Sequence, residues 1–183
     1  FDKIDCCSAN DSNEINPISI DVNEKEETTH YSVIDKWGNS VSVTTTINGW
    51  YGSGITVDGS GFLLNNEMDD FSSKPGYPNK YGLIGSWANS IEPNKRMLSS
   101  MTPTIIEDVD GDVFLIVGSP GGSTIITSVL QTILNVYEFN MSVSDAVSAP
   151  RFHHQWLPDL IFFESDRFSE ETLTNLSSKG YEL

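Results

Sequence analysis

Hydroxyl-bearing residues near the start of the chain have the spacing that nucleophilic chemistry would need. Thr28 and Thr29 precede a strand-like segment at 30–35, and Thr46 and Asn48 end the strand-like segment that follows it. A threonine hydroxyl is a weak nucleophile unless a base lies beside it. If the chain were cut before Thr28, the new α-amino group, with a pKa of roughly 7.7–8.0, could be that base, and Thr46 could hold the pair in place. Threonines are also ordinary strand residues, and spacing alone favours that interpretation.

A glycine-rich turn is the second candidate. Gly121 and Gly122 follow a predicted strand at 113–117 and precede a predicted helix at 124–137. Backbone N–H groups in such a turn, together with the helix dipole, could stabilise the oxyanion that forms during acyl transfer. A turn that needs positive φ and a phosphate nest are the alternatives, although the lysine of a Walker motif is absent.

Two polar clusters could bind the ends of a charged substrate. Residues 65–70 follow an apolar segment and include Glu67 and Asp70, whose carboxylates could hold an ammonium group or a divalent metal. A solvated strand end is the alternative. Ser99 and Ser100 follow two basic residues, and hydroxyls in that setting can bind a carboxylate, although a capped turn also fits.

Two further motifs suggest metals but favour structural interpretations. His153 and His154 are adjacent, so they point apart on an extended chain, and no third ligand is spaced to help. The acidic turn at 108–112 resembles part of a calcium loop but lacks the downstream glutamate and the flanking helices. We predict a hairpin turn there, no metal site and no cofactor.

A predicted β-hairpin must position the threonines. The segment at 40–46 alternates at period two and is rich in β-branched residues, and a turn separates it from the strand before it. If that turn centres between Trp37 and Gly38, Thr29 faces Thr46, and their hydroxyls meet at one sheet edge.

The remaining elements are strands first and helices later. A β segment is predicted around 61–65, a hairpin at 104–117, a helix at 124–137, and shorter helices after Ser142 and Ser169. Residues 72–96 are rich in proline and glycine, which predicts a long loop of the kind that often forms a lid. This order predicts an α+β, or layered α/β, fold.

Composition limits the possible partners. The 183 residues carry a net charge of -16, and a surface so negative repels nucleic acid. No stretch has the roughly 18–20 unbroken apolar residues of a membrane helix. Residues 1–27 hold eight acidic and two basic residues, which indicates an acidic linker. The first residues carry no signal peptide and the end is abrupt, so we expect a piece of a longer protein.

Taken together, these motifs resemble those of the γ-glutamyltransferases and occur in the family's order across roughly residues 28–165. The matching stretches are TTHYSV at 28–33, LNNEMDDF at 64–71, PNKR and LSSM within 93–101, GSPGGS at 118–123, and APRFHHQW at 149–156. A joint match of this kind is far more specific than any of its parts.

The resemblance implies a precursor that cuts itself between Glu27 and Thr28. Residues 1–27 would then be an acidic linker from the end of the large subunit. Residues 28–183 would be the small-subunit catalytic domain, truncated at its carboxy terminus. The implied fold is the four-layer αββα sandwich of N-terminal-nucleophile hydrolases, present in part. Thr28 would attack the γ-carbonyl of glutathione or another γ-glutamyl compound, and the acyl group would pass to water, an amino acid or a peptide.

The resemblance also implies residue roles. Thr46 would orient the nucleophile, Gly121 and Gly122 would form the oxyanion hole, and Tyr81 would lie in a lid over the donor. The donor's charged groups would be held by five residues: Asn48, Glu67 and Asp70 for the α-amino group, and Ser99 and Ser100 for the α-carboxylate.

The implied partner is the large subunit, which in the family supplies an arginine to the donor carboxylate. We therefore expect the isolated chain to be inactive. The implied location is the periplasm, the medium or the outer face of a membrane. Two rival functions stay open: an acylase of the same superfamily, of the cephalosporin or glutaryl type, and a non-catalytic binding paralogue that would not be cut at Thr28.

Overall fold

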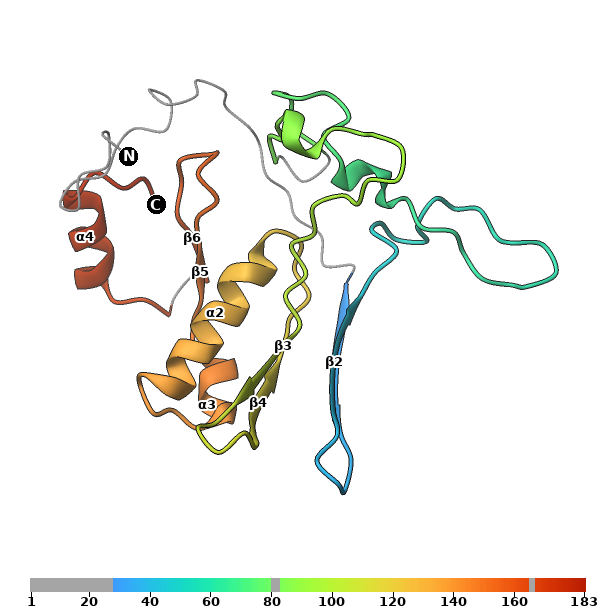
Figure 1. Ribbon diagram of the computed structural model, residues 1–183. Coiled ribbons are helices and arrows are strands. Elements are labelled where there is room, and N and C mark those ends of the chain that lie inside the picture. The colour runs from blue at the N-terminus through green and yellow to red at the C-terminus, as the bar shows by residue number, and fades with distance from the viewer. Residues whose placement is uncertain (1–27, 80–82, 165–166) are drawn as a thin grey trace. The chain divides into compact units, whose positions relative to one another are not determined.

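A computed structural model describes residues 28–79, 83–164 and 167–183 (Figure 1). The chain forms two compact units, which the described residues represent as 28–129 and 130–183. Both units mix strands with helices, and within the described ranges each sheet has two antiparallel strands. The predicted α+β class is confirmed.

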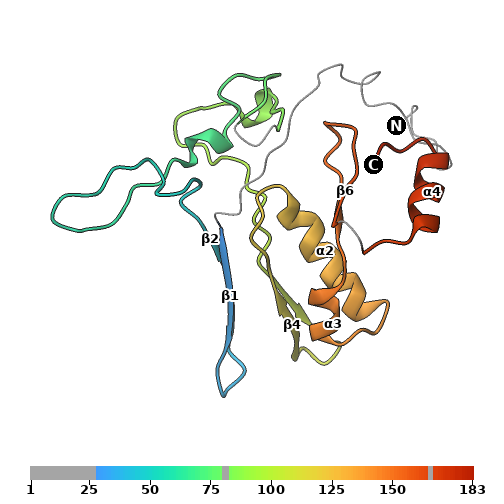
Figure 2. The ribbon, with the colours of Figure 1, turned by 180° about the vertical axis from the view of Figure 1, so that it is seen from behind.

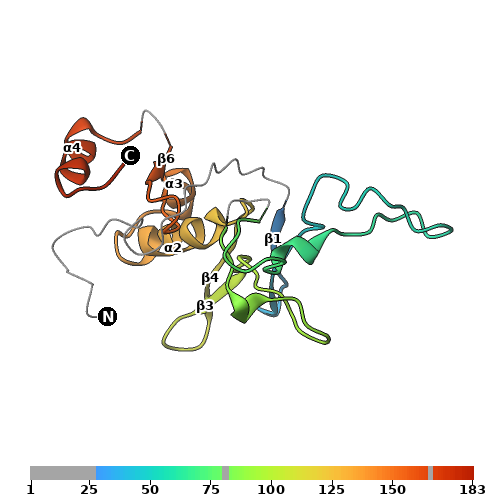
Figure 3. The same cartoon turned by 90° about the horizontal axis from the view of Figure 1, so that it is seen from above.

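Residues 28–129 contain two β-hairpins. Strands β1 (Thr29–Ile34) and β2 (Ser40–Thr45) pair to form the first, which is drawn in blue in Figure 2. Strands β3 (Thr104–Glu107) and β4 (Val113–Val117) form the second, which can be followed in Figure 3. The Ser42 hydroxyl donates to the carbonyl of Val117 (3.3 Å), so β2 lies beside β4.

The register of the first hairpin differs from the prediction by one residue. Ile34 pairs with Ser40 and Thr29 with Thr45, so the turn centres on Trp37 and not between Trp37 and Gly38. The physical reason is a loop of residues 36–38, in which Gly38 adopts a φ of +88°. The Asp35 carboxylate accepts hydrogen bonds from the backbone amides of Trp37, inside this loop, and Asn39, just after it, and so holds that geometry.

The second hairpin turns in the same way. The Asp108 carboxylate accepts from the amides of Asp110 and Asp112, and Gly111 has a φ of +87°. The acidic residues at 108–112 therefore form a hairpin turn, as predicted. Within the described residues, no group of three or more histidine, cysteine or acidic side chains is arranged to hold a metal.

The long segment between the hairpins has little regular structure. It contains the short 3-10 helices η1 (Glu67–Asp70) and η2 (Trp87–Asn89). The β segment predicted around 61–65 does not form a regular strand, but an isolated antiparallel bridge joins Leu63 to Thr56. Gly59 and Gly61 both have positive φ and turn the chain back, and Phe62 and Leu64 then make backbone hydrogen bonds with residues 53–57.

Helix α2 (Thr124–Tyr137) follows β4. Leu115 and Val117 alternate along β4 and so share one face, while Ile125 and Val129 lie one turn apart on the helix. All four side chains are buried and belong to the core.

Residues 130–183 continue α2 and add α3 (Val143–Ser148), β5 (Phe152–His153), β6 (Phe162–Phe163) and α4 (Glu170–Ser178). The predicted caps are confirmed, since Ser142 accepts from the amide of Asp145 and Ser169 from that of Thr172, both at 3.1 Å. Across the described ranges, no helix combines the length and hydropathy that crossing a membrane requires.

Candidate active site

The ends of β1 and β2 bring the two predicted catalytic threonines together. Thr29 pairs with Thr45, so continuing the register by one residue sets Thr28 opposite Thr46. Both side chains are half-buried. The corrected register therefore aligns the predicted nucleophile directly with the threonine that the family resemblance assigned to orient it. Glu27, the residue on the other side of the predicted cleavage site, lies outside the described residues.

A tight turn after β2 presents Asn48. The hydroxyl oxygen of Thr46 accepts from the Asn48 backbone amide at 2.9 Å, and Asn48 adopts a φ of +71°. Asn48 is 4% exposed, and its side-chain amide donates to the carbonyl of Asn66 at 3.1 Å. The Asn66 side chain in turn accepts from the amide of Gly49 at 2.9 Å. These bonds attach the end of β2 to the segment that carries the carboxylates.

The predicted carboxylates occupy η1, directly after Asn66. Glu67 and Asp70 are both half-buried, and the Glu67 amide donates to the Asn65 side chain at 3.0 Å. Phe71, 5% exposed, anchors the end of this turn in the core. The hydrogen bonds from Thr46 through Asn48 to Asn66 thus place Glu67 and Asp70 in the same part of the molecule as Thr28.

The predicted serines lie in an extended segment before β3. Ser99 is exposed, Ser100 is half-buried, and the Ser99 hydroxyl accepts from the Met101 amide at 3.2 Å. The amide of Leu98 donates to the Asn89 side chain at 2.9 Å, and Asn89 also donates to the carbonyl of Asp70 at 2.7 Å. The structure therefore links the serine segment to η1 through one asparagine.

The basic residues before the serines make a separate contact. The Lys95 ammonium group pairs with Glu92 at 2.8 Å. Hydrogen bonds from Lys95 and from the Ser90 hydroxyl lower the pKa of the Glu92 carboxyl. Lys95 is thus directed toward Glu92.

The glycine turn, the predicted oxyanion hole, lies directly before α2. Gly121 is buried with a φ of +128°, and Gly122 has a φ of +57°. Their carbonyls accept from the first amides of α2, on Thr124 (3.0 Å) and Ile125 (3.3 Å). A Cβ on Gly121 would lie 2.4 Å from the Thr124 hydroxyl, so a side chain is excluded. The turn therefore opens α2 at its positively polarised end.

Gly118 joins this turn to the threonine hairpin. A Cβ on Gly118 would lie 2.2 Å from two atoms of the His30 ring, so the backbone of β4's end packs directly against that ring. The ring nitrogens of His30 contact the hydroxyls of Thr44 (2.8 Å) and Ser32 (3.1 Å). His30 is two residues from Thr28 and Gly118 is three from Gly121, so β1, which follows the predicted nucleophile, lies beside the start of the glycine turn.

Sequence reasoning missed two residues that organise this region, His30 and Asn89. The signal for His30 was its place two residues after Thr28, since alternate residues of a strand share a face. Asn89 had no periodic signal, because its partners are backbone groups. Tyr81, the predicted lid residue, lies outside the described residues.

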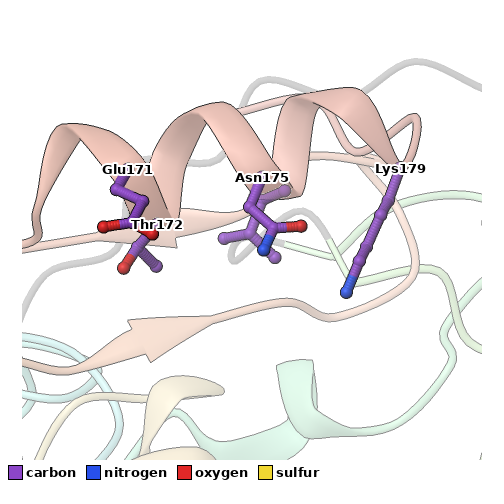
Figure 4. A pocket seen from close by; sticks show the side chains of 5 residues that line it. Glu171, Thr172, Asn175 and Lys179 are labelled. Atoms are coloured by element: carbon purple, nitrogen blue, oxygen red, sulfur yellow. The ribbon is translucent and has the colours of Figure 1, made fainter.

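The predicted structural histidines and a surface pocket belong to residues 130–183. His153 is buried and contacts Gln155 at 2.9 Å, while His154 contacts Asp159 at 3.0 Å. A pocket of about 190 Å³ lies along α4 (Figure 4). It is lined by Glu171, Thr172, Asn175, Leu176 and Lys179. Ligand sites usually exceed about 300 Å³, and no residue predicted to do chemistry lines this one.

Comparison with known proteins gives a consistent result. The family model described as gamma-glutamyltranspeptidase matches residues 2–183. The chain is 53% identical over 182 residues to a glutathione hydrolase proenzyme of Escherichia coli (strain K12), covering 100% of this chain and 31% of that protein. The chain spans about a third of the length of this relative and of two Pseudomonas glutathione hydrolase proenzymes that it also resembles.

Solved structures show the same fold. An acivicin-inhibited gamma-glutamyltranspeptidase matches with a TM-score of 0.80 and 62% identity, covering 84% of this chain and 81% of that one. The transpeptidase CapD of Bacillus anthracis matches with a TM-score of 0.60 and 27% identity, covering 84% and 75%. The predicted N-terminal-nucleophile hydrolase fold is confirmed.

Proposed function

The chain belongs to the gamma-glutamyltranspeptidase family, and from this premise we propose that it carries the catalytic residues of a γ-glutamyl acyltransferase and hydrolase. The observation that supports this most is the pairing of Thr29 with Thr45, which by continuation sets Thr28 opposite Thr46, together with the hydrogen-bonded path from Thr46 to the segment of Glu67. The donor would be glutathione or a related γ-glutamyl compound.

Maturation would precede catalysis. The chain would be cut between Glu27 and Thr28, and the new α-amino group at Thr28 would then act as the base for the Thr28 hydroxyl. An α-amino group has a pKa of roughly 7.7–8.0, so a useful fraction is neutral near pH 7. A relative's name, proenzyme, and a solved relative's description, which mentions autoprocessing, support this step.

The chemistry would be acyl transfer in two stages. The Thr28 hydroxyl oxygen attacks the γ-carbonyl carbon while its proton passes to the α-amino group. The oxyanion that forms is stabilised by the backbone N–H groups at Gly121 and Gly122, which lie at the positive end of α2. The C–N bond then breaks, the leaving amine takes the proton, and water or an amine attacks the ester to release the glutamyl group.

The zwitterionic head of the donor would be held at both charged groups. The carboxylates of Glu67 and Asp70 and the amide of Asn48 would bind the α-amino group, and the hydroxyls of Ser99 and Ser100 would bind the α-carboxylate. Holding both groups fixes the direction of the γ-carbonyl, and positioning of this kind is a large part of catalysis.

We also propose that a large subunit from the same precursor completes the enzyme. Exposed apolar side chains on the first hairpin support this, including Val33 (52%), Ile34 (58%) and Val41 (49%). Surfaces of this kind often mark an interface. On this proposal the isolated chain lacks activity, and the enzyme lies in the periplasm, the medium or on the outer face of a membrane. The location follows from the family resemblance alone.

The test uses the full-length precursor. Mass spectrometry should find a new amino terminus at Thr28, and Thr28→Ala should prevent both that cut and the hydrolysis of γ-glutamyl-p-nitroanilide. The mature protein should prefer this donor over glutaryl-p-nitroanilide, which lacks the α-amino group, by at least about 100-fold. An uncut, inactive wild-type protein would favour the binding paralogue, and faster glutaryl turnover would favour the acylase.

A further inference from the structure

One asparagine connects the two segments that would bind opposite ends of the donor. The Asn89 side-chain amide nitrogen donates to the carbonyl of Asp70 at 2.7 Å. Its side-chain oxygen accepts from the amide of Leu98, the residue before Ser99, at 2.9 Å. A single planar group thus bonds to the last residue of η1 and to the residue that precedes the serines.

The chemistry of these partners requires an amide. A carbonyl such as that of Asp70 can only accept, and a backbone amide such as that of Leu98 can only donate, so the residue between them needs one donor and one acceptor. A carboxylate offers acceptors alone. Asparagine therefore satisfies both segments, whereas aspartate at position 89 would satisfy only Leu98.

Asn89 is itself held in place by its backbone. It ends η2, where its amide donates to the carbonyl of Ser86 at 3.1 Å. Its own carbonyl accepts from the amide of Ser72 at 2.8 Å, and the neighbouring Ser90 forms a bridge with Ser72. Because Phe71 is buried just before Ser72, this backbone pairing fixes Asn89 relative to the core.

The segment that carries the serines depends on such a tie. Residues 94–103 form no helix or strand, and Leu98 is 64% exposed, so side-chain packing at Leu98 does little to fix its backbone. The hydrogen bond from the Leu98 amide to Asn89 supplies a direct tertiary restraint one residue before Ser99.

We propose that Asn89 is a positioning residue that sets the separation between the ammonium-binding and carboxylate-binding halves of the donor site. This inference rests on the proposed function. The α-amino and α-carboxylate groups of a glutamyl donor are attached to the same carbon, so the two halves must converge on one atom. Asn89 does not touch the donor, and it acts through Asp70 and Leu98.

The consequence is selectivity for donors that carry both charged groups. A glutaryl donor keeps the carboxylate but lacks the amino group, so it engages one half of the site only. A change in the separation of the halves therefore harms binding of the γ-glutamyl donor more than binding of the glutaryl donor.

The experiment compares variants of the full-length precursor with γ-glutamyl-p-nitroanilide and glutaryl-p-nitroanilide. Asn89→Leu removes both hydrogen bonds at similar volume, and Asn89→Asp keeps the acceptor for Leu98 but loses the donor to Asp70. Asn39→Leu is the matched control, because the Asn39 side chain also donates a hydrogen bond (to Asp35, 2.7 Å) but sits at a hairpin tip.

We expect Asn89→Leu to be cut at Thr28 and to raise the KM for the γ-glutamyl donor about 10-fold to 100-fold. The preference for γ-glutamyl over glutaryl donor should fall about 10-fold, and Asn89→Asp should lie between Asn89→Leu and wild type. Asn39→Leu should match wild type in both measurements.

Equal losses with both donors, or an unchanged KM and preference in Asn89→Leu, would overturn the proposal. If Asn89→Leu is not cut at Thr28, Asn89→Asp decides: a mature Asn89→Asp protein with wild-type preference also overturns it. A wild-type precursor that is uncut or that ignores γ-glutamyl-p-nitroanilide contradicts the proposed function instead, whatever the variants do.

Discussion

Replacing Gly118 by alanine tests how the glycine turn is joined to β1. The added Cβ would lie 2.2 Å from two ring atoms of His30, more than an ångström inside ordinary van der Waals contact, which begins at 3.4 Å. Either the ring or the strand must move. The ring moves at the expense of its contacts with Thr44 and Ser32, whereas moving β1 would break its pairing with β2.

The magnitude follows from those two contacts. A hydrogen bond contributes about 1 kcal/mol to stability, so expelling the ring should lower the free energy of unfolding by about 2 kcal/mol. His30→Ala removes the same two contacts and the ring as well, which leaves room for the new methyl group. Gly118→Ala should therefore cost about 2 kcal/mol in wild type and close to nothing in the His30→Ala background.

The assay is a double-mutant cycle on the full-length protein. Urea unfolding of wild type, Gly118→Ala, His30→Ala and the double variant gives the coupling free energy between the two positions, which should be about 2 kcal/mol. Additive effects of Gly118→Ala and His30→Ala, or a Gly118→Ala protein as stable as wild type, would refute the close packing of strand end and ring.

Three further predictions concern other parts of the chain. Gly52→Ala should reduce γ-glutamyl-p-nitroanilide turnover much more than Gly59→Ala. Both glycines have positive φ, which costs an alanine roughly 1–2 kcal/mol, but of the two only a Cβ on Gly52 would meet backbone, at 2.2 Å from the Leu64 carbonyl oxygen. Equal turnover by the two variants would contradict this. Burial lowers the pKa of His30 below its ordinary value of 6.5, so the folded state takes up a proton there less readily than the unfolded state. The free energy of unfolding, measured by urea titration, should therefore fall as the pH drops through 6.5. A His30→Gln variant with the same pH dependence would show that His30 is not the cause. Gln131→Leu, which removes two hydrogen bonds to the backbone of the first residue of β5, should lower the free energy of unfolding by about 1–2 kcal/mol in urea titrations, and an unchanged value would show that these bonds are not needed.

Local patterns predicted most of the regular structure. The period-two runs of both hairpins, the helical spacing of α2 and the capping residues Ser142 and Ser169 each report on neighbours in sequence. Such signals are readable because the physical cause lies within a few residues. The glycine turn at Gly121 belongs to the same class, since its positive φ follows from its residue type.

The errors arose where a side chain or a distant backbone group decides the outcome. The hairpin register depended on the Asp35 carboxylate, which holds a loop of residues 36–38 and shifts the pairing by one residue. The same pattern, an aspartate three residues before a glycine, occurs at Asp108, and comparing the two turns could have revealed it.

The site was only partly accessible from sequence. The types of Glu67, Asp70 and the two serines suggested a binding role, but spacing could not show that they share one region. That connection runs through Asn89, whose partners are backbone groups on segments far apart in sequence. A sequence identifies side chains but not the backbone groups that will be their hydrogen-bond partners. No sequence pattern therefore marks an asparagine that bridges two irregular segments.

The loop of residues 36–38 fixes an alignment far from itself. It lies at one end of the first hairpin, and the Thr28–Thr46 pair lies at the other, about 20 Å away at roughly 3.3 Å per residue. Substitutions that keep the Asp35 carboxylate and Gly38 leave this alignment intact, whereas an inserted or deleted residue that slid one strand past the other by one position would turn Thr46 to the opposite face. Over evolutionary time the other residues of the tip are therefore free to change in chemistry, whereas the length of the tip is constrained by the distant Thr28–Thr46 alignment.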